Sequence, residues 1–158
     1  FATFIGLPRR DEKGRRNSYL YFSSGQYQIY DKINLFEPMN ENIVYVPGEE
    51  PGVIETEFGR FGVAVCYDLR FPELFQDLAA QNVNWIIVPA AWPNVRIADW
   101  HRLIIERATE TGCHVIGVNT VGDDGVNIFG GTSMVAAPDG RILAQADETR
   151  EQIVAVQI

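Results

Sequence analysis

The stretch FGVAVCYDLRFPEL, residues 61–74, decides the fold because it joins a buried strand to a helix through a short polar turn. Residues 61–66 do not alternate between apolar and polar side chains, which indicates a strand that is buried on both faces. Pro72 suits the first turn of a helix, and the apolar residues after it recur at helical spacing. Cys66 therefore stands at the carboxyl end of a buried strand, where open α/β folds bind their ligands.

The next segment repeats this order of strand and helix. NWIIVPA, residues 84–90, predicts another buried strand, and ADWHRLIIERATETG, residues 98–112, predicts a helix that Gly112 can end. One face of this helix carries Trp100, Leu103 and Ile104. The alternation predicts a mixed α/β fold with a sheet at its centre.

Hairpins and short strands are predicted on both sides of this centre. A strand is expected over residues 3–7, and a long ordered loop, of a length that is often functional, over residues 34–52. Two hairpins are expected, over residues 17–33 with a turn at Ser24-Gly25 and over residues 53–66 with a turn at Gly59-Arg60. Four further strands are expected over residues 114–122, 128–137, 141–146 and 152–158.

Composition limits the classes of function. The length predicts one domain, residues 1–158. Thirteen Lys and Arg against 21 Asp and Glu give a net charge of -8, which would repel a nucleic-acid backbone. No apolar run approaches the roughly 20 residues that span a bilayer, so a membrane is not an expected partner either. Two cysteines cannot build a disulfide framework, which favours a cytoplasmic location.

Two segments raise questions of organisation. The basic run PRRDEKGRR, residues 8–16, is expected to be a solvated loop, with anion binding as the alternative. The sequence begins with FATFIGL, which predicts a strand from the first residue, and it ends with another predicted strand. Two strands cut off in this way would leave unpaired sheet edges. We therefore expect the chain to be a fragment of a longer protein.

Cys66 has two interpretations. Free cysteine is among the most buried residue types, so a structural role is one of them. In the other, Cys66 is a nucleophile: backbone N–H groups of Tyr67 and Asp68 point at a developing oxyanion, and the positive end of the following helix favours the thiolate. Cys113 merely joins a helix to a strand.

The partners of a reactive Cys66 are not histidines in this sequence. His101 lies within a helix and His114 opens a strand, and no spacing typical of a metal site occurs. Lys32 follows an aromatic strand, where it is either an oxyanion-binding cation or an ordinary surface lysine. Glu41, in the long loop, cannot be told from a solvated carboxylate by position alone.

Seven motifs taken in order resemble the nitrilase superfamily of carbon–nitrogen hydrolases. They are YDKINLF, ENIVYVPGE, GRFGVAVCYDLRFPEL, VPAAWP, DWHRLIIERATETG, VNTVGDDG and FGGTSMVAAPDGRI, and they extend over nearly the whole chain. The pattern is most similar to the ω-amidase branch, which hydrolyses the terminal amide of small oxo-dicarboxylic acid monoamides. The resemblance implies a four-layer α-β-β-α sandwich, incomplete in this chain.

The resemblance also implies roles for individual residues. Cys66 corresponds to the nucleophile, Lys32 to the lysine that stabilises the oxyanion, and Glu41 to an assisting glutamate, while the N–H of Tyr67 shares the oxyanion. The family's general base is a glutamate that ends an early strand, and no segment of this chain matches it. We therefore expect the isolated polypeptide to be catalytically impaired.

Candidate substrate contacts are less closely tied to the motifs. Arg70 either holds a substrate carboxylate or forms an ion pair with Asp68 or Glu73. Trp92 and Phe129 are pocket walls or core aromatics, and Asn119 is a candidate at a strand end. Relatives commonly have a histidine where this chain has Asp99 and a small residue where it has Glu106.

These implications give one leading function and three alternatives. We expect hydrolysis of a carboxylate-bearing small-molecule amide through a cysteine thioester, without a cofactor or metal, in a homodimer or larger homo-oligomer. The alternatives are another activity of the superfamily (a nitrilase or an N-carbamoyl amidohydrolase), an inactive fragment with an assembly role, and an unrelated binding domain with a buried cysteine.

Overall fold

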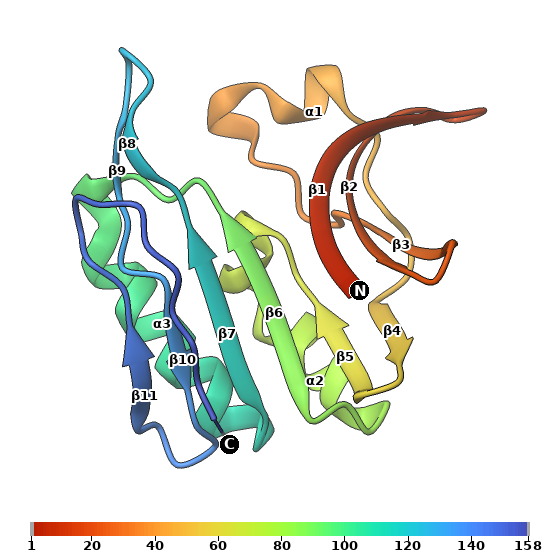
Figure 1. The fold of residues 1–158 in the computed structure, drawn as a ribbon. Coiled ribbons are helices and arrows are strands. Elements are labelled where there is room, and N and C mark those ends of the chain that lie inside the picture. Colours follow the sequence, from red (N-terminus) through yellow and green to blue (C-terminus); the bar gives the residue numbers. More distant parts are fainter. Residues whose placement is uncertain (1, 158) are drawn as a thin grey trace.

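A six-stranded mixed sheet forms the centre of the fold in the computed structural model, which describes residues 2–157 (Figure 1). The strand order is β11-β10-β7-β6-β5-β4. The pairs β5–β6 and β6–β7 are parallel, and the other pairs are antiparallel. The strands are β4 (Gly52–Thr56), β5 (Gly59–Val63), β6 (Trp85–Ala90), β7 (His114–Asn119), β10 (Met134–Ala136) and β11 (Ile142–Gln145).

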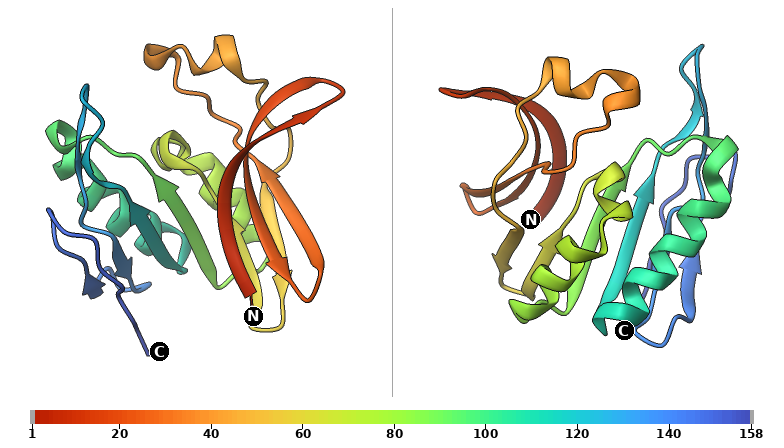
Figure 2. Two further views of the ribbon diagram at one scale, coloured as in Figure 1. Left: turned by 45° about the horizontal axis from the view of Figure 1, so that its top comes forward. Right: turned by 180° about the vertical axis from the view of Figure 1, so that it is seen from behind.

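Two helices, α2 (Pro72–Ala80) and α3 (Ile97–Thr111), cover one face of this sheet, as the right-hand view of Figure 2 shows. Phe75 of α2 and Trp100 of α3 are fully buried between helices and sheet. Gly117 lets the indole of Trp100 lie against β7, because a Cβ atom there would come within 2.6 Å of the ring. Both helices confirm the sequence predictions, including the start at Pro72.

A three-stranded antiparallel sheet packs against the other face, over β4, β5 and β6 (Figure 1). Its strands are β1 (Ala2–Asp11), β2 (Gly14–Ser23) and β3 (Gln26–Asp31), in the order β1-β2-β3. Tyr19, Tyr21 and Tyr30 enter the interface and meet Ile54, Val63 and Ile87 of the larger sheet. A helix layer and two sheets therefore lie in succession, in the α/β class that the sequence predicts.

Short elements complete the described chain. They are the 3-10 turns η1 (Glu37–Met39), η2 (Cys66–Arg70) and η3 (Asn94–Arg96), the single-turn helix α1 (Glu41–Val44), and the hairpin of β8 (Val121–Asp123) and β9 (Ile128–Gly130). The segment expected to be one long loop thus holds η1 and α1. No helix of residues 2–157 combines the length and the apolar character that a membrane crossing requires.

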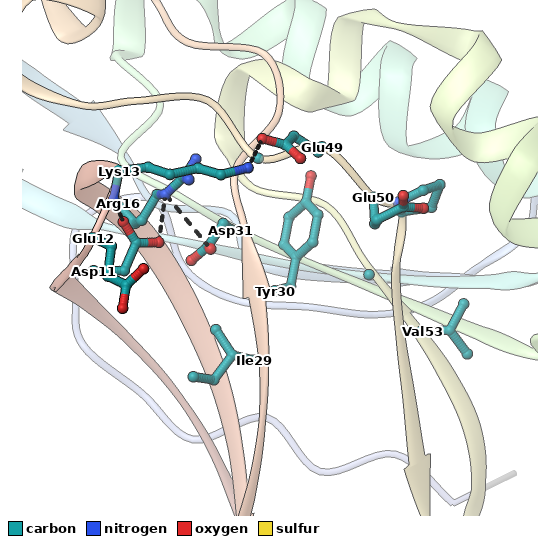
Figure 3. Close-up of a pocket in the computed structure, with 13 residues that line it drawn as sticks. Asp11, Glu12, Lys13, Arg16, Ile29, Tyr30, Asp31, Glu49, Glu50 and Val53 are labelled. Atoms are coloured by element: carbon teal, nitrogen blue, oxygen red, sulfur yellow. Dashed lines mark hydrogen bonds and ion pairs between the residues drawn. The ribbon is translucent and has the colours of Figure 1, made fainter.

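The basic run at residues 8–16 is not a solvated loop, which corrects the sequence prediction. It forms the end of the β1–β2 hairpin, in which Arg9 pairs with Arg16 across the strands. Asp11 and Asp31 neutralise these two arginines, and Arg16 is only 4% exposed. Figure 3 shows Arg16 between the two carboxylates in a pocket of about 610 Å³. These pairings favour a structural role for the run over anion binding.

Several strand predictions also differ from the structure. The strand expected over residues 114–122 is divided into β7 and β8, and the one expected over residues 128–137 into β9 and β10. The second hairpin turns at residues 57–58, two positions before the predicted Gly59-Arg60. Residues 152–157 form no strand, because apolar alternation alone does not supply a neighbouring strand for pairing. Phe1 and Ile158, the outer ends of the two predicted terminal strands, lie outside the described residues.

Candidate active site

A cavity of about 910 Å³ opens beside the carboxyl ends of β5 and β6. Cys66, three residues after β5, lines it together with Ala91, which follows β6. Lys32 and Glu41 reach it from the segment that follows β3. Side chains predicted from separate parts of the sequence therefore share one cavity, on the side of the sheet where parallel strands end.

Cys66 adopts a backbone conformation that is unusual for a residue with a side chain. Its φ angle is 51°, in the left-handed region, at the point where the chain leaves β5 and enters η2. This conformation costs roughly 1–2 kcal/mol for an L-residue. Such strain is found preferentially at functional sites, where the surrounding structure imposes it.

Burial raises the pKa of the Cys66 thiol above its ordinary value. The positive charge of Lys32 and the N–H of Ala91 oppose this effect without overcoming it, and the Glu41 carboxylate adds to it. The helix whose positive end was expected to favour the thiolate, α2, begins only at Pro72, after the short η2 turn. A reactive Cys66 needs a base.

Lys32 and Glu41 form a largely buried ion pair. Lys32 is 3% exposed, and its Nζ lies 2.5 Å from Oε2 of Glu41. The Glu41 carboxylate also accepts hydrogen bonds from Nδ2 of Asn17 at 2.7 Å and from the N–H of Phe36 at 2.6 Å. Burial acts to raise the pKa of Glu41, but these donors outweigh it and hold the pKa below its usual range. Glu41 is thus ionised and orients the lysine.

Asp68 connects the segment after β3 to the cysteine turn. Its fully buried carboxylate accepts hydrogen bonds from the hydroxyl of Tyr30 and the N–H of Val65, both at 2.8 Å. The N–H and Nδ2 of Asn34 donate to the other oxygen at 2.8 and 2.9 Å. Because Asn34 lies two residues after Lys32, this carboxylate fixes the lysine segment against the residue that precedes Cys66.

The turn after Cys66 presents one of the two N–H groups expected at an oxyanion. The N–H of Asp68 donates to the carbonyl of Val65 at 3.1 Å and is therefore engaged. Tyr67 lines the cavity, and its ring packs against Phe36 and Phe71 at centroid distances of 4.8 and 5.3 Å. The N–H of Tyr67 is the better candidate of the two.

Arg70 and Trp92 lie together in the cavity wall. Nη2 of Arg70 is 2.9 Å from Oδ2 of Asp99, and its guanidinium carbon lies 4.9 Å from the centre of the Trp92 ring. Arg70 thus forms an ion pair, as one of the two alternatives predicted, but its partner is Asp99 of α3 and not Asp68 or Glu73. Trp92 is both a wall of the cavity and a buried neighbour of Trp100.

The structure separates the remaining two candidates. Phe129 of β9 lines the cavity, whereas Asn119 does not. Asn119 is buried: its Oδ1 accepts the N–H of Trp92 at 2.6 Å, and its Nδ2 donates to the carbonyl of Gly131 at 2.9 Å. The expectation that Asn119 contacts substrate is therefore corrected to a role in holding the Trp92 loop.

Sequence reasoning missed three polar residues at this site. Asn17 and Asp68 position the ion pair and the turn, and Arg96 lines the cavity. Asp68 had a weak signal, as an acidic residue directly after a buried strand, whereas Asn17 and Arg96 had none. No group of three or more His, Cys, Asp or Glu side chains within residues 2–157 is placed to hold a metal ion.

Comparison with known proteins gives one family. The family model described as carbon-nitrogen hydrolase matches residues 2–158. The 2-oxoglutaramate amidase of Bacillus subtilis is 34% identical over 142 residues, which are 88% of this chain and 54% of that protein. The chain thus spans about half the length of this relative.

Two solved structures are similar to the fold as well. A CN-hydrolase superfamily protein of Xanthomonas campestris with an arsenic adduct in its active site has a TM-score of 0.90 and 32% identity, covering 97% of this chain and 60% of its own. An amidase of Nesterenkonia sp. AN1, with acrylamide added at its active-site cysteine, has a TM-score of 0.87 and 28% identity, covering 94% and 60%.

Proposed function

The chain belongs to the carbon–nitrogen hydrolase family, and from that premise we propose that it hydrolyses the amide of a small carboxylate-bearing molecule through a thioester at Cys66. The observation that carries this proposal is the meeting of Cys66 and the buried Lys32–Glu41 pair at one cavity. The name of the 2-oxoglutaramate amidase supports the substrate class, since that substrate is an amide that carries a carboxylate.

In the proposed reaction Cys66 loses its proton to a base and its sulfur attacks the amide carbon. The carbonyl oxygen becomes an oxyanion, which the ammonium group of Lys32 and the N–H of Tyr67 stabilise. The C–N bond then breaks, the nitrogen takes a proton and ammonia leaves, so the acyl group remains on sulfur as a thioester. Water attacks this thioester, releases the carboxylic acid and returns the thiol.

A base must accept the proton of Cys66 during the attack, because burial raises the pKa of the thiol. Glu41 is poorly suited to this task because three donors hold its carboxylate and depress its pKa. These two observations favour, as a second candidate, a chain that binds amides but turns them over slowly.

We further propose that the protein acts in the cytoplasm as a homodimer. Both cysteines are free thiols, which suits a reducing compartment. The helix layer of α2 and α3 is the surface through which the family resemblance leads us to expect pairing. Size-exclusion chromatography with light scattering measures the mass of the assembly directly.

The proposed function is tested by ammonia release from glutaramate, a dicarboxylic acid monoamide, together with intact mass spectrometry. We expect ammonia and a covalent acyl adduct, both lost in Cys66→Ala and retained in Cys113→Ala. Turnover that survives Cys66→Ala would overturn the proposal. A single equivalent of ammonia per chain together with a persistent adduct would support the second candidate, because the thioester forms with loss of ammonia but is then hydrolysed slowly.

A further inference from the structure

Three cationic side chains line the active-site cavity, and in the part of the chain that the structure describes one of them, Arg96, has no carboxylate partner. Lys32 is paired with Glu41, and Arg70 is paired with Asp99. Within residues 2–157 Arg96 forms no ion pair. The positive charge of Arg96 at the edge of the cavity is thus not neutralised by the protein.

The backbone of Arg96 is held firmly although its side chain is exposed. Its N–H donates to the carbonyl of Pro93 at 3.0 Å, and its carbonyl accepts the indole N–H of Trp92 at 2.8 Å. Arg96 also precedes α3, directly before Ile97. The planar guanidinium can bind a carboxylate through two N–H groups at once, so it loses less freedom for each hydrogen bond formed than a lysine would.

Trp92 places the two arginines in one wall. The face of its ring lies beneath Arg70, and its indole N–H fixes Arg96. Asp99 pairs with Arg70, so of these two guanidinium groups only that of Arg96 is without a carboxylate partner in the described chain. A guanidinium without such a partner can pair with one carboxylate group on a substrate.

The acidic residue at the same edge is engaged elsewhere. Asp124 lines the cavity, but its Oδ1 accepts the N–H groups of Val126 and Asn127 at 2.9 and 2.7 Å. These hydrogen bonds lower the pKa of Asp124 and hold its charge within the β8–β9 turn. Asp124 forms no ion pair with Arg96 in the described chain, so the guanidinium stays available to a ligand.

We propose that Arg96 is the specificity-determining residue for the substrate carboxylate, and that Arg70 is a positioning residue that keeps Trp92 in place. The substrate class is then a short monoamide whose amide lies at Cys66 and whose carboxylate lies at the cavity edge beside Arg96. This inference rests on the proposed function for its role in catalysis. The binding of the substrate carboxylate, however, can be measured without turnover.

The test measures binding alone, in a Cys66→Ala background that cannot form the thioester. Isothermal calorimetry compares glutaramate with the neutral glutaramide, in chains with Arg96 or with Arg96→Gln. We expect Arg96→Gln to weaken glutaramate binding by about tenfold, the effect of one charge-assisted contact, and to leave glutaramide binding unchanged. We expect Arg96→Lys to restore part of the affinity.

A matched control is Arg141→Gln, which removes another exposed arginine, one that pairs with Asp139 and does not line the cavity. It should leave both affinities unchanged. Equal glutaramate affinity with and without Arg96, or equal losses for the charged and the neutral amide, would overturn the inference. Because no turnover is measured, this result is independent of ammonia release, so failure of the inference and failure of the proposed function are distinguishable.

Discussion

The backbone of Cys66 is unfavourable in the resting protein in a way that suits a reacting group. Its φ angle lies in the left-handed region, which a buried cysteine with a purely structural role does not require. This strain favours the nucleophilic interpretation over the structural one, because strain of this kind is kept where function depends on it. Burial also raises the pKa of the thiol, which by itself fits either role, so a nucleophilic Cys66 depends on a base.

The backbone strain at Cys66 predicts that glycine is tolerated at this position better than alanine. Glycine adopts positive φ without penalty, whereas alanine keeps the Cβ atom that causes the clash. We expect Cys66→Gly to be more stable than Cys66→Ala by about 1 kcal/mol. Urea denaturation of both variants measures the difference. If Cys66→Ala is the more stable variant, the left-handed geometry is not a source of strain.

The two thiols should also differ in chemical accessibility. Cys66 lines the cavity, whereas Cys113 is 3% exposed and its Sγ contacts the carbonyl of Val83 at 3.2 Å. We expect iodoacetamide to modify Cys66 at least tenfold faster than Cys113 in the folded protein at neutral pH, as peptide mapping would show. Equal rates would mean that the cavity does not expose the sulfur.

For single residues, the sequence predicted the site correctly where a chemically reactive side chain follows a predicted strand. Cys66 follows β5 of the larger sheet and Lys32 follows β3 of the smaller one, and both reach the cavity. Asn119 also ends a strand, but its amide is used by neighbouring backbone groups, which a sequence pattern does not show. Arg96 was missed because its role depends on which other cations are already neutralised.

At the scale of elements, Asp68 is the connection between β3 and the η2 turn. Four hydrogen bonds converge on the two oxygens of its carboxylate. An amide has the same size, but its NH₂ group would replace one oxygen and face at least one N–H group, which can only donate. We expect Asp68→Asn to destabilise the fold by about 3 kcal/mol. Asp77→Asn, on the exposed side of α2, is the control and should lie within about 0.5 kcal/mol of the parent.

The ion pair between the β3 end and α1 predicts a dependence of stability on pH. The folded pKa of Glu41 lies below the ordinary glutamate value of 4.5, so the stability that the ion pair contributes is present above that value and is lost as the pH falls through the folded pKa. At pH 7, Glu41→Gln should lower the unfolding free energy by about 3 kcal/mol, because it leaves Lys32 buried and uncompensated.

Urea denaturation across the acidic range checks this prediction. The difference between the parent and Glu41→Gln should shrink steadily as the pH falls below 4.5. Glu73→Gln, an exposed carboxylate of α2 with no ion pair in the described chain, is the control and should show no such trend. A constant difference at all pH values would contradict the assignment of Glu41 as the stabilising carboxylate.

Elements were predictable from sequence where local periodicity determines them. Helices α2 and α3 follow from apolar spacing and from their end signals, Pro72 and Gly112. The β1–β2 hairpin was not recognised because Arg9 is neutralised by Asp31, a residue 22 positions away on β3. A charged run looks like a solvated loop when the partners that bury it are remote in sequence.

At the scale of the whole molecule, the site exists because two sheets pack face to face. β3 belongs to the smaller sheet and β5 to the larger one, and their ends bring Lys32 and Cys66 to the same cavity (Figure 1). The tyrosines between the sheets and the Asp68 carboxylate maintain this arrangement. No local pattern encodes such a contact, so it was accessible before the structure only through the family resemblance.

The central claim is that the ammonium group of Lys32 acts on the sulfur of Cys66 across the two sheets. Titration of thiolate absorbance in a Cys113→Ala, Glu41→Gln background measures this effect without a second thiol or an unpaired carboxylate. We predict an upward shift of the Cys66 pKa when Lys32 is replaced by methionine, because a cation that lowers this pKa is removed, and no shift for Lys13→Met. An unchanged pKa in the Lys32→Met variant would contradict the account.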